Sequence, residues 1–147
     1  MTIEFRRIIV PIDGSVASKK AAKKAIYLAK HLSVDITAIH VIDPTRSMLA
    51  PELMSSIDKM MSEQAHSYLH EIEKIGKRNG VTIATKIVRG VPFMKIISEA
   101  KRNDLIVMGH KGRTALDKIL LGSVSEKVVR HALCPVMIVR EPKEETL

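Results

Sequence analysis

The sequence contains little cysteine, few aromatic residues and no long apolar run, and each shortage excludes a class of protein. A single cysteine, Cys134, excludes an internal disulfide framework and fits a reducing compartment. Aromatic residues make up 3% of the chain, too few for a platform on which single-stranded nucleic acid stacks. No apolar run approaches the roughly 18 residues that a membrane span needs, and the first residues lack the apolar stretch of a signal peptide. We therefore expect a cytoplasmic protein that does not bind a membrane.

The formal charge of +8 raises the possibility of a nucleic-acid partner. However, the lysines are spread along the chain, as within the expected helix at residues 15–33. Long charged side chains usually coat a helix surface. We therefore favour a solvated surface and expect no nucleic-acid partner.

The 147 residues, 46% of them hydrophobic and 27% charged, are typical of a globular protein that buries its core without disulfides or metals. We find no internal repeat and no linker, so residues 1–147 are expected to form one domain.

Short β-branched runs alternate with helical patterns along the chain. The expected strands are residues 5–12, 35–42, 81–88, 104–108 and 136–139. Helices are expected at residues 15–33, from about residue 54 to Asn79-Gly80, after Gly90-Val91-Pro92, and from Ser123. Strands that alternate with helices predict an α/β fold, a single doubly wound domain with a parallel sheet and right-handed crossovers.

Three of the seven glycines lie together after the fourth expected strand, and this stretch carries the functional signal. Gly109, Gly112, Gly122 and Ser123 give the spacing G-x2-G-x9-G-S, between a buried strand and a helix start. Glycines let backbone N–H groups approach a phosphate closely, and a helix start adds unpaired N–H groups. The spacing matches neither the Walker A loop nor G-x-G-x-x-G.

In this spacing the stretch resembles the nucleotide-binding signature of the universal stress protein family. The resemblance implies a five-stranded parallel sheet in the order 3-2-1-4-5 with helices on both faces, which brings the loops after strands one and four together across a crevice. It also implies ATP as the ligand, with Mg²⁺ or Mn²⁺ bridging the phosphates. The ligand-binding residues that we expect are Pro11, Asp13, Val41, Gly109, Gly112, Arg113, Gly122, Ser123, Val124 and Ser125.

The resemblance also implies a role for several of these residues. Asp13 lies near the nucleoside and the metal, and the backbone of Val41 points towards adenine. The three motif glycines and Ser123 hold the phosphates, with Val124 and Ser125 just beyond.

Simpler explanations exist for several of these residues. Ser123 and Glu126 form the S-x-x-E pattern of a capping box, so the serine could serve only its own helix. Asp13, in Asp-Gly-Ser, is equally well explained as a turn residue, and Gly112 could be a turn glycine. These alternatives stay open from the sequence.

Other polar residues give weaker signals. Lys111, Arg113 and Lys118 against Asp117 leave the glycine loop with an excess of positive charge, which suits a polyphosphate. We interpret His110 as an incidental, exposed loop residue.

Two further histidines lie outside the motif. His66 and His70 have the i, i+4 spacing of a metal pair, but without a third ligand we interpret them as surface histidines and expect no dedicated metal ligands in the chain.

The motif offers a phosphate cradle without an evident catalytic base, nucleophile elbow or kinase signature. We predict an ATP-binding regulatory or stress-response protein, a nucleotide-dependent switch with at most slow ATP hydrolysis. The alternatives are a structural or partner-binding dimer module that does not use nucleotide, a slow ATPase, or a metabolic enzyme of the wider adenine-nucleotide α/β group. If residues 136–139 form an edge strand, pairing of two such edges predicts a homodimer, and an unidentified protein partner is possible.

Overall fold

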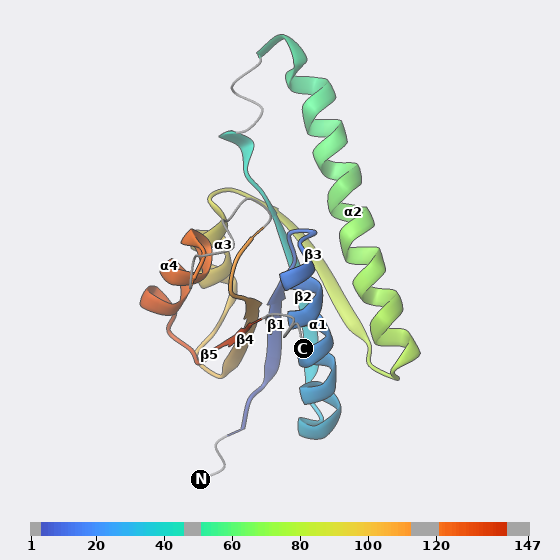
Figure 1. Ribbon diagram of the computed structural model, residues 1–147, viewed down its shortest axis with the longest axis vertical. Helices are drawn as coiled ribbons and strands as arrows, with labels where there is room; N and C mark the ends of the chain where they lie inside the picture. The colour runs from blue at the N-terminus through green and yellow to red at the C-terminus, as the bar shows by residue number, and fades with distance from the viewer. Residues whose placement is uncertain (1–3, 46–50, 113–120, 141–147) are drawn as a thin grey trace, which may run out of the picture.

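A five-stranded parallel sheet forms the centre of the protein, as seen in a computed structural model that describes residues 4–45, 51–112 and 121–140 (Figure 1). The strands are β1 (Arg7–Pro11), β2 (Asp35–Ile42), β3 (Ile83–Arg89), β4 (Asp104–Gly109) and β5 (Val136–Val139). Their order is β3-β2-β1-β4-β5, all neighbours parallel, which confirms the predicted fold class and strand order.

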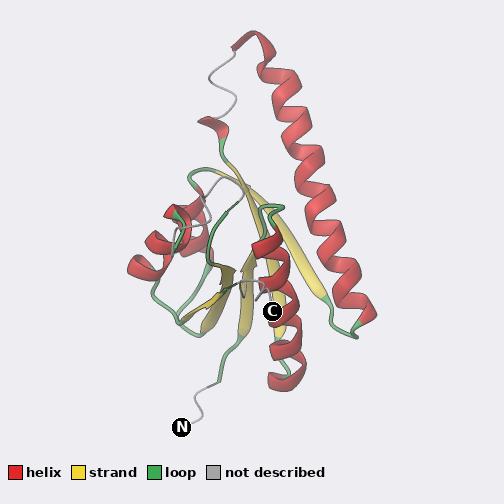
Figure 2. Cartoon of the chain, in the orientation of Figure 1, coloured by secondary structure: helices red, strands yellow, loops and turns green. Residues whose placement is uncertain are grey.

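Helices cover both faces of the sheet (Figure 2). They are α1 (Val16–Leu32), a 3₁₀ turn η2 (Pro51–Leu53), α2 (Met54–Arg78), α3 (Pro92–Glu99) and α4 (Ser123–His131). The core cluster beneath α1 and α2 contains Ile8, Val10 and Val107, whereas Ile9, Ile106 and Met108 pack on the other side with α3 and α4. This alternation follows from the two-residue period of a strand.

The central strands are buried on both faces, as their continuous apolar sequence predicts. Every residue of β4 is buried, and so are Ile8 to Val10 of β1. The ends of some elements differ from the predictions. β1 is confined to Arg7–Pro11 and β3 begins at Ile83, because residues 5–6 and 81–82 do not join the ladder. These shifts leave the topology unchanged.

The two long helices end differently from each other. The C-cap of α1, Ser33, adopts the left-handed conformation with φ of 56°. At the end of α2 the C-cap, Asn79, has φ of −100°, and the following Gly80 takes the left-handed conformation. The Asn-Gly pair at which the sequence predicts the end of this helix therefore closes it through the left-handed Gly80.

A buried ion pair fastens the amino end of β4. The side chain of Asp104 has no solvent exposure, and its Oδ2 accepts hydrogen bonds from Arg7 Nη2 at 3.2 Å and from the backbone N–H of Lys101 at 2.8 Å. The Nε of Arg7 adds a third bond at 3.3 Å. Charge-assisted bonds of this kind compensate for burying the carboxylate.

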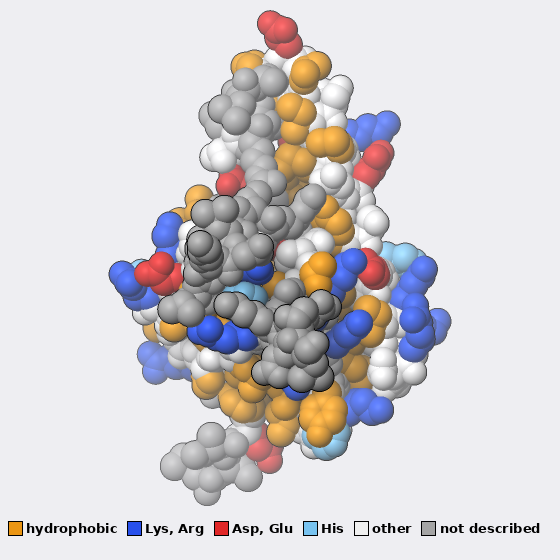
Figure 3. Space-filling view, viewed as in Figure 1, with side chains coloured by type: hydrophobic (Ala, Val, Ile, Leu, Met, Phe, Trp, Pro, Cys, Tyr) orange, Lys and Arg blue, Asp and Glu red, His pale blue; other side chains and the backbone are white. Residues whose placement is uncertain are grey.

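The N-terminal half of α2 rises past the carboxyl ends of the strands (Figure 1). Apolar side chains follow this part of the helix in the space-filling view, and Leu53, Met54 and Met60 are all more than two fifths exposed (Figure 3). The side chain of Asp58 links this half of α2 to β3 through an ion pair with Arg89, at 3.6 Å. In the part of the chain that is described, no helix is long and apolar enough to cross a membrane.

Candidate functional site

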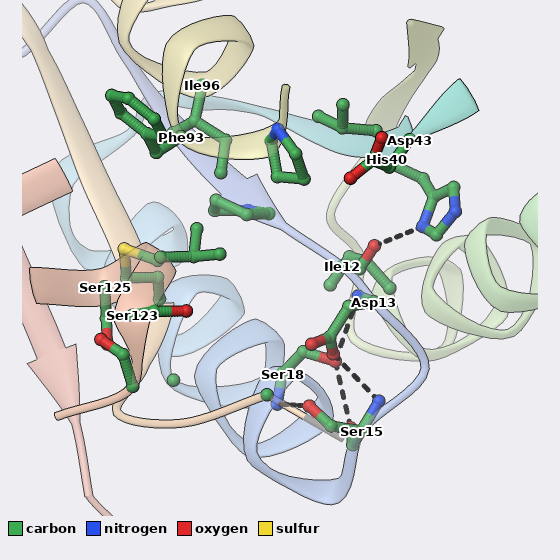
Figure 4. Close-up of a pocket in the computed structure, with 18 of the residues that line it drawn as sticks. Ile12, Asp13, Ser15, Ser18, His40, Asp43, Phe93, Ile96, Ser123 and Ser125 are labelled. Carbon is green, nitrogen blue, oxygen red and sulfur yellow. Dashed lines mark hydrogen bonds between the residues drawn. The ribbon is translucent and has the colours of Figure 1, made fainter. Parts of the chain in front are cut away.

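A cavity of about 600 Å³ opens at the carboxyl ends of the strands (Figure 4). Doubly wound sheets bind their ligands in this position, and the volume is within the usual range for small-molecule sites. Nine of the ten ligand-binding residues expected from the sequence line the cavity, and the tenth, Arg113, lies outside the described residues. The nine are Pro11, Asp13, Val41, Gly109, Gly112, Gly122, Ser123, Val124 and Ser125.

The strand order explains why residues a hundred positions apart meet here. β1 and β4 are neighbours, so the turn after β1 and the loop after β4 face each other. A Cβ atom on Gly112 would lie 3.0 Å from Oδ2 of Asp13. The predicted meeting of these two loops is confirmed, and any larger residue at position 112 would press on the carboxylate.

Asp13 uses its two carboxylate oxygens differently. Its Oδ1 accepts a hydrogen bond from the backbone N–H of Ser15 at 2.9 Å, which is turn chemistry, while Oδ2 faces Gly112. Ser15 in turn caps α1, since its hydroxyl accepts from the N–H of Ser18 at 3.0 Å. The turn role of Asp13 therefore exists and still leaves one oxygen towards the cavity.

The glycine loop is closed by its own backbone. The N–H of Gly122 donates to the carbonyl oxygen of His110 at 2.6 Å, and a Cβ on Gly122 would lie 3.1 Å from Cα of Lys111. A side chain at position 122 would therefore press on the backbone of Lys111, so glycine favours the close approach of these two chain segments. None of the three motif glycines has a positive φ, so Gly112 is not there to permit a left-handed turn.

The start of α4 corrects one prediction. Gly122, not Ser123, is the N-cap residue, and no side chain among the described residues caps this helix. Glu126 is paired with Arg130 at 2.9 Å instead of reaching back, so the capping-box interpretation of Ser123 is wrong. Ser123 is exposed on the cavity wall, and its hydroxyl has no hydrogen bond to the described residues. The first N–H groups of α4 are thus open towards the cavity.

Ser125 differs from Ser123 in its contacts. Its side chain is buried, and its hydroxyl lies 2.9 Å from the carbonyl oxygen of His110 and 3.1 Å from that of Gly122. It therefore ties α4 to the glycine loop from within. His110 is half-buried rather than exposed, and its Nδ1 is buried with no hydrogen-bond partner among the described residues.

Sequence reasoning included Val41 at the end of β2 but missed the walls supplied by α2 and α3. From α2 come Met61, Gln64 and Tyr68, and Val91, Pro92 and Phe93 line the cavity at the start of α3. The N-terminus of α3 also lacks a side-chain cap. The period of a helix shows which residues share a face but not how far the helix extends past the sheet. No sequence signal therefore indicated the contribution of α2.

Among the described residues there is no group of three His, Cys, Asp or Glu side chains that could hold a metal ion. His66 and His70 line a separate groove between α2 and β3, away from the predicted site, together with Glu73.

Comparison with known proteins identifies the family. The family model described as universal stress protein family matches residues 4–140. Universal stress protein MJ0531 of Methanocaldococcus jannaschii is 40% identical over 145 residues, which cover 96% of this chain and 85% of that protein.

Solved structures have the same fold. The universal stress protein UspA from Lactobacillus plantarum superimposes with a TM-score of 0.84 at 26% identity, over 93% of this chain and 99% of that one. A universal stress protein in complex with cAMP gives a TM-score of 0.68 at 24% identity, over 93% of this chain and 98% of that one. One from Archaeoglobus fulgidus in complex with dAMP gives 0.63 at 19%, with the same coverage. A match across nearly the whole chain, together with the sheet order observed here, shows that this protein belongs to the universal stress protein family.

Proposed function

We propose that this protein binds an adenine nucleotide, ATP in the first instance, in the cavity at the carboxyl ends of the strands, and works as a nucleotide-dependent regulator. The observation that carries the proposal is the convergence of nine predicted residues on one cavity, next to a helix N-terminus that no described side chain caps. Two proteins of the same fold have been solved with cAMP and with dAMP, which supports an adenine nucleotide as the ligand.

The lining of the cavity offers both kinds of surface that a nucleotide needs. The apolar side chains of Val41, Phe93, Ile96 and Met108 suit a base. The glycine loop and the start of α4 supply backbone N–H groups, which favour phosphate. Lys127, whose ammonium group lies 4.9 Å from the ring centroid of Phe93, adds positive charge to the wall.

The residues at the phosphate end fit a divalent cation bound together with the nucleotide. Oδ2 of Asp13 faces Gly112, so phosphates in the loop would lie beside a carboxylate. Two negatively charged groups so close together would repel each other. Mg²⁺ and Mn²⁺ favour carboxylate and phosphate oxygens as ligands, so either cation would offset this repulsion. Asp13 is the residue that would hold the metal, which would neutralise phosphate charge, while the phosphates would supply further ligands.

We propose at most slow hydrolysis of the nucleotide. General base catalysis needs a positioned side chain that takes a proton from water. The titratable side chains Asp13, His40 and Asp43 line the cavity, and each is held by a hydrogen bond to the chain nearby, at 2.9, 2.6 and 3.0 Å respectively. Within the described chain, no two of these three side chains are hydrogen-bonded to each other as a nucleophile and its base would be. This arrangement favours a binding protein over an ordinary ATPase.

Calorimetry with ATP and Mg²⁺ tests the proposal, with ADP, AMP and cAMP as comparison ligands. We expect saturable binding to the wild type and a loss of at least tenfold for Gly112→Val, because the branched side chain would occupy the space between the loop and Asp13. Ala84→Val, at an exposed position on β3, is the matched control and should bind as the wild type does. Equal binding by Gly112→Val and wild type would remove the loop from the site, and no binding by wild type would refute the function.

The edge of the sheet at β5 offers a surface for assembly. β5 is an edge strand with an apolar sequence, and none of its residues is fully buried in the described chain. Exposed apolar edges tend to pair, so we propose a homodimer formed by two β5 edges. In this proposal, a further protein would bind a surface of the dimer that changes when nucleotide is bound. The alternative is a dimeric partner-binding module that uses no nucleotide. A monomeric mass by light scattering at micromolar concentration would refute the dimer.

A further inference from the structure

His40, near the end of β2, lines the cavity and is bonded to the turn that carries Asp13 (Figure 4). Its Nδ1 lies 2.6 Å from the carbonyl oxygen of Ile12. A carbonyl oxygen can only accept a hydrogen bond, so Nδ1 carries the proton of this bond. In the neutral ring Nε2 is then unprotonated, which fixes the tautomer.

This bond continues the pairing of β1 with β2 beyond the end of β1. The paired residues of the two strands end at Pro11 and Ile39, and the N–H of Ile12 donates to the carbonyl oxygen of Ile39 at 2.8 Å. Both backbone polar groups of Ile12 are thus held by β2, the N–H by backbone and the carbonyl by His40. The next residue is Asp13, so the direction in which its side chain leaves the backbone depends on this peptide.

Tyr68 of α2 supports the same turn from the other side. Its ring meets the ring of His40 edge-on, with centroids 5.7 Å apart. It also lies directly over Gly14, where an added Cβ would be 2.4 to 2.8 Å from three ring atoms. Gly14 has a φ of +82°, so the turn needs a glycine both for its backbone and for this contact.

We propose that His40 is a positioning residue of the nucleotide site: its Nδ1–H holds the Ile12 carbonyl, and with Tyr68 behind it this contact keeps Oδ2 of Asp13 aimed at Gly112. The inference rests on the proposed function, since positioning matters only if the cavity holds a ligand. It also links α2 to the site, because Tyr68 and the cavity residues Met61 and Gln64 belong to one helix.

Three substitutions of His40 separate positioning from packing. His40→Leu removes the donor, and we expect ATP with Mg²⁺ to bind about tenfold more weakly, the equivalent of one lost hydrogen bond. In His40→Asn the amide nitrogen is attached to Cγ, as Nδ1 is in histidine, so it can donate to the same carbonyl oxygen. This variant should bind ATP within about threefold of wild type. His40→Gln carries its amide nitrogen one carbon further out and should behave as His40→Leu does.

The control is His31→Leu. His31 makes the same kind of bond, Nδ1 to the carbonyl oxygen of Tyr27 at 2.8 Å, but on the exposed surface of α1. We expect its loss to leave ATP affinity unchanged. Wild-type affinity in His40→Leu, or an Asn variant that is folded and binds as weakly as the Leu variant, would overturn the proposal.

Nitrogen NMR of the wild-type protein without nucleotide gives a test that depends neither on ligand binding nor on the folding of a variant. We expect the spectrum of the neutral His40 ring to show a protonated Nδ1 and a bare Nε2. The opposite tautomer would overturn the proposal. If the wild type bound no nucleotide while His40 showed the expected tautomer, the proposed function would fail and the bond to Ile12 would stand. If ATP bound equally to wild type and His40→Leu, the function would stand and the positioning role would fail.

Discussion

Ser123 and Ser125 lie two residues apart on α4 and both line the cavity, yet alanine at the two positions should have different effects. Ser123 is exposed, and its hydroxyl is not bonded to any described residue. If it donates to a phosphate, its loss removes a hydrogen bond to a charged acceptor, which contributes about 1.5 to 3 kcal/mol, or roughly 10- to 100-fold in affinity. Because the side chain is exposed, we expect Ser123→Ala to change the free energy of unfolding by less than about 0.5 kcal/mol.

Ser125→Ala should show the converse pattern. The buried hydroxyl serves two carbonyl oxygens, of His110 and Gly122, and each of these keeps a second donor, from the N–H of Gly122 at 2.6 Å and of Glu126 at 2.9 Å. The substitution therefore leaves no acceptor bare and costs about 1 kcal/mol, the net worth of one neutral hydrogen bond. For a chain of this length that corresponds to a fall in Tm of about 2 to 4 °C. We expect the affinity for ATP to change by less than about threefold.

The assay pairs calorimetry with ATP and Mg²⁺ with thermal unfolding in the absence of nucleotide, on both variants and wild type. The expected result is a loss of affinity without a loss of stability for Ser123→Ala, and a loss of stability with near-normal affinity for Ser125→Ala. If Ser125→Ala lost as much affinity as Ser123→Ala while its Tm stayed the same, the buried hydroxyl would be a ligand contact and the reasoning would be refuted.

Asp104→Ala should lower the free energy of unfolding by about 3 to 5 kcal/mol, measured by urea titration, because it leaves the Arg7 charge partly buried and unpaired; an unchanged midpoint would contradict this. Burial raises the pKa of the Cys134 thiol, and the charge of Asp104 adds to the effect. The thiol should therefore react slowly with Ellman's reagent at pH 8 in the folded protein and quickly in the unfolded chain. The contribution of the neutral thiol to the free energy of unfolding is present below the unfolded pKa of about 8.5, and it should be lost as the pH rises through the higher pKa of the folded state. Met137→Asp, at an exposed position of β5, should shift the mass measured by light scattering from dimer to monomer if two β5 edges pair.

The fold was predictable because its signals are local and repeated. β2 and β5 have the predicted bounds, and β4, with its continuous apolar sequence, is buried throughout. The helical period of the α2 sequence predicts an inward stripe made of Ile57, Met61, Ala65, Tyr68, Ile72 and Ile75. Ala65 and Ile72 of this stripe are buried, whereas Leu69 and Gly76 are buried without belonging to it.

The site was less predictable because its details depend on contacts between distant segments. The S-x-x-E pattern fits a helix whose N-cap is Ser123 as well as one that begins one residue earlier, and the 2.6 Å bond between Gly122 and His110 accompanies the second arrangement. His40 gave no signal at all, since a histidine in a strand pattern becomes part of the site only through the register of β1 against β2.

The ion pair of Asp104 with Arg7 lies at the amino ends of the strands, and the cavity lies at their carboxyl ends. Substitutions at the amino rim of the sheet should therefore change the melting temperature without changing the shape of the cavity at the opposite rim. For protein engineers the same separation makes the amino rim the safer end to modify.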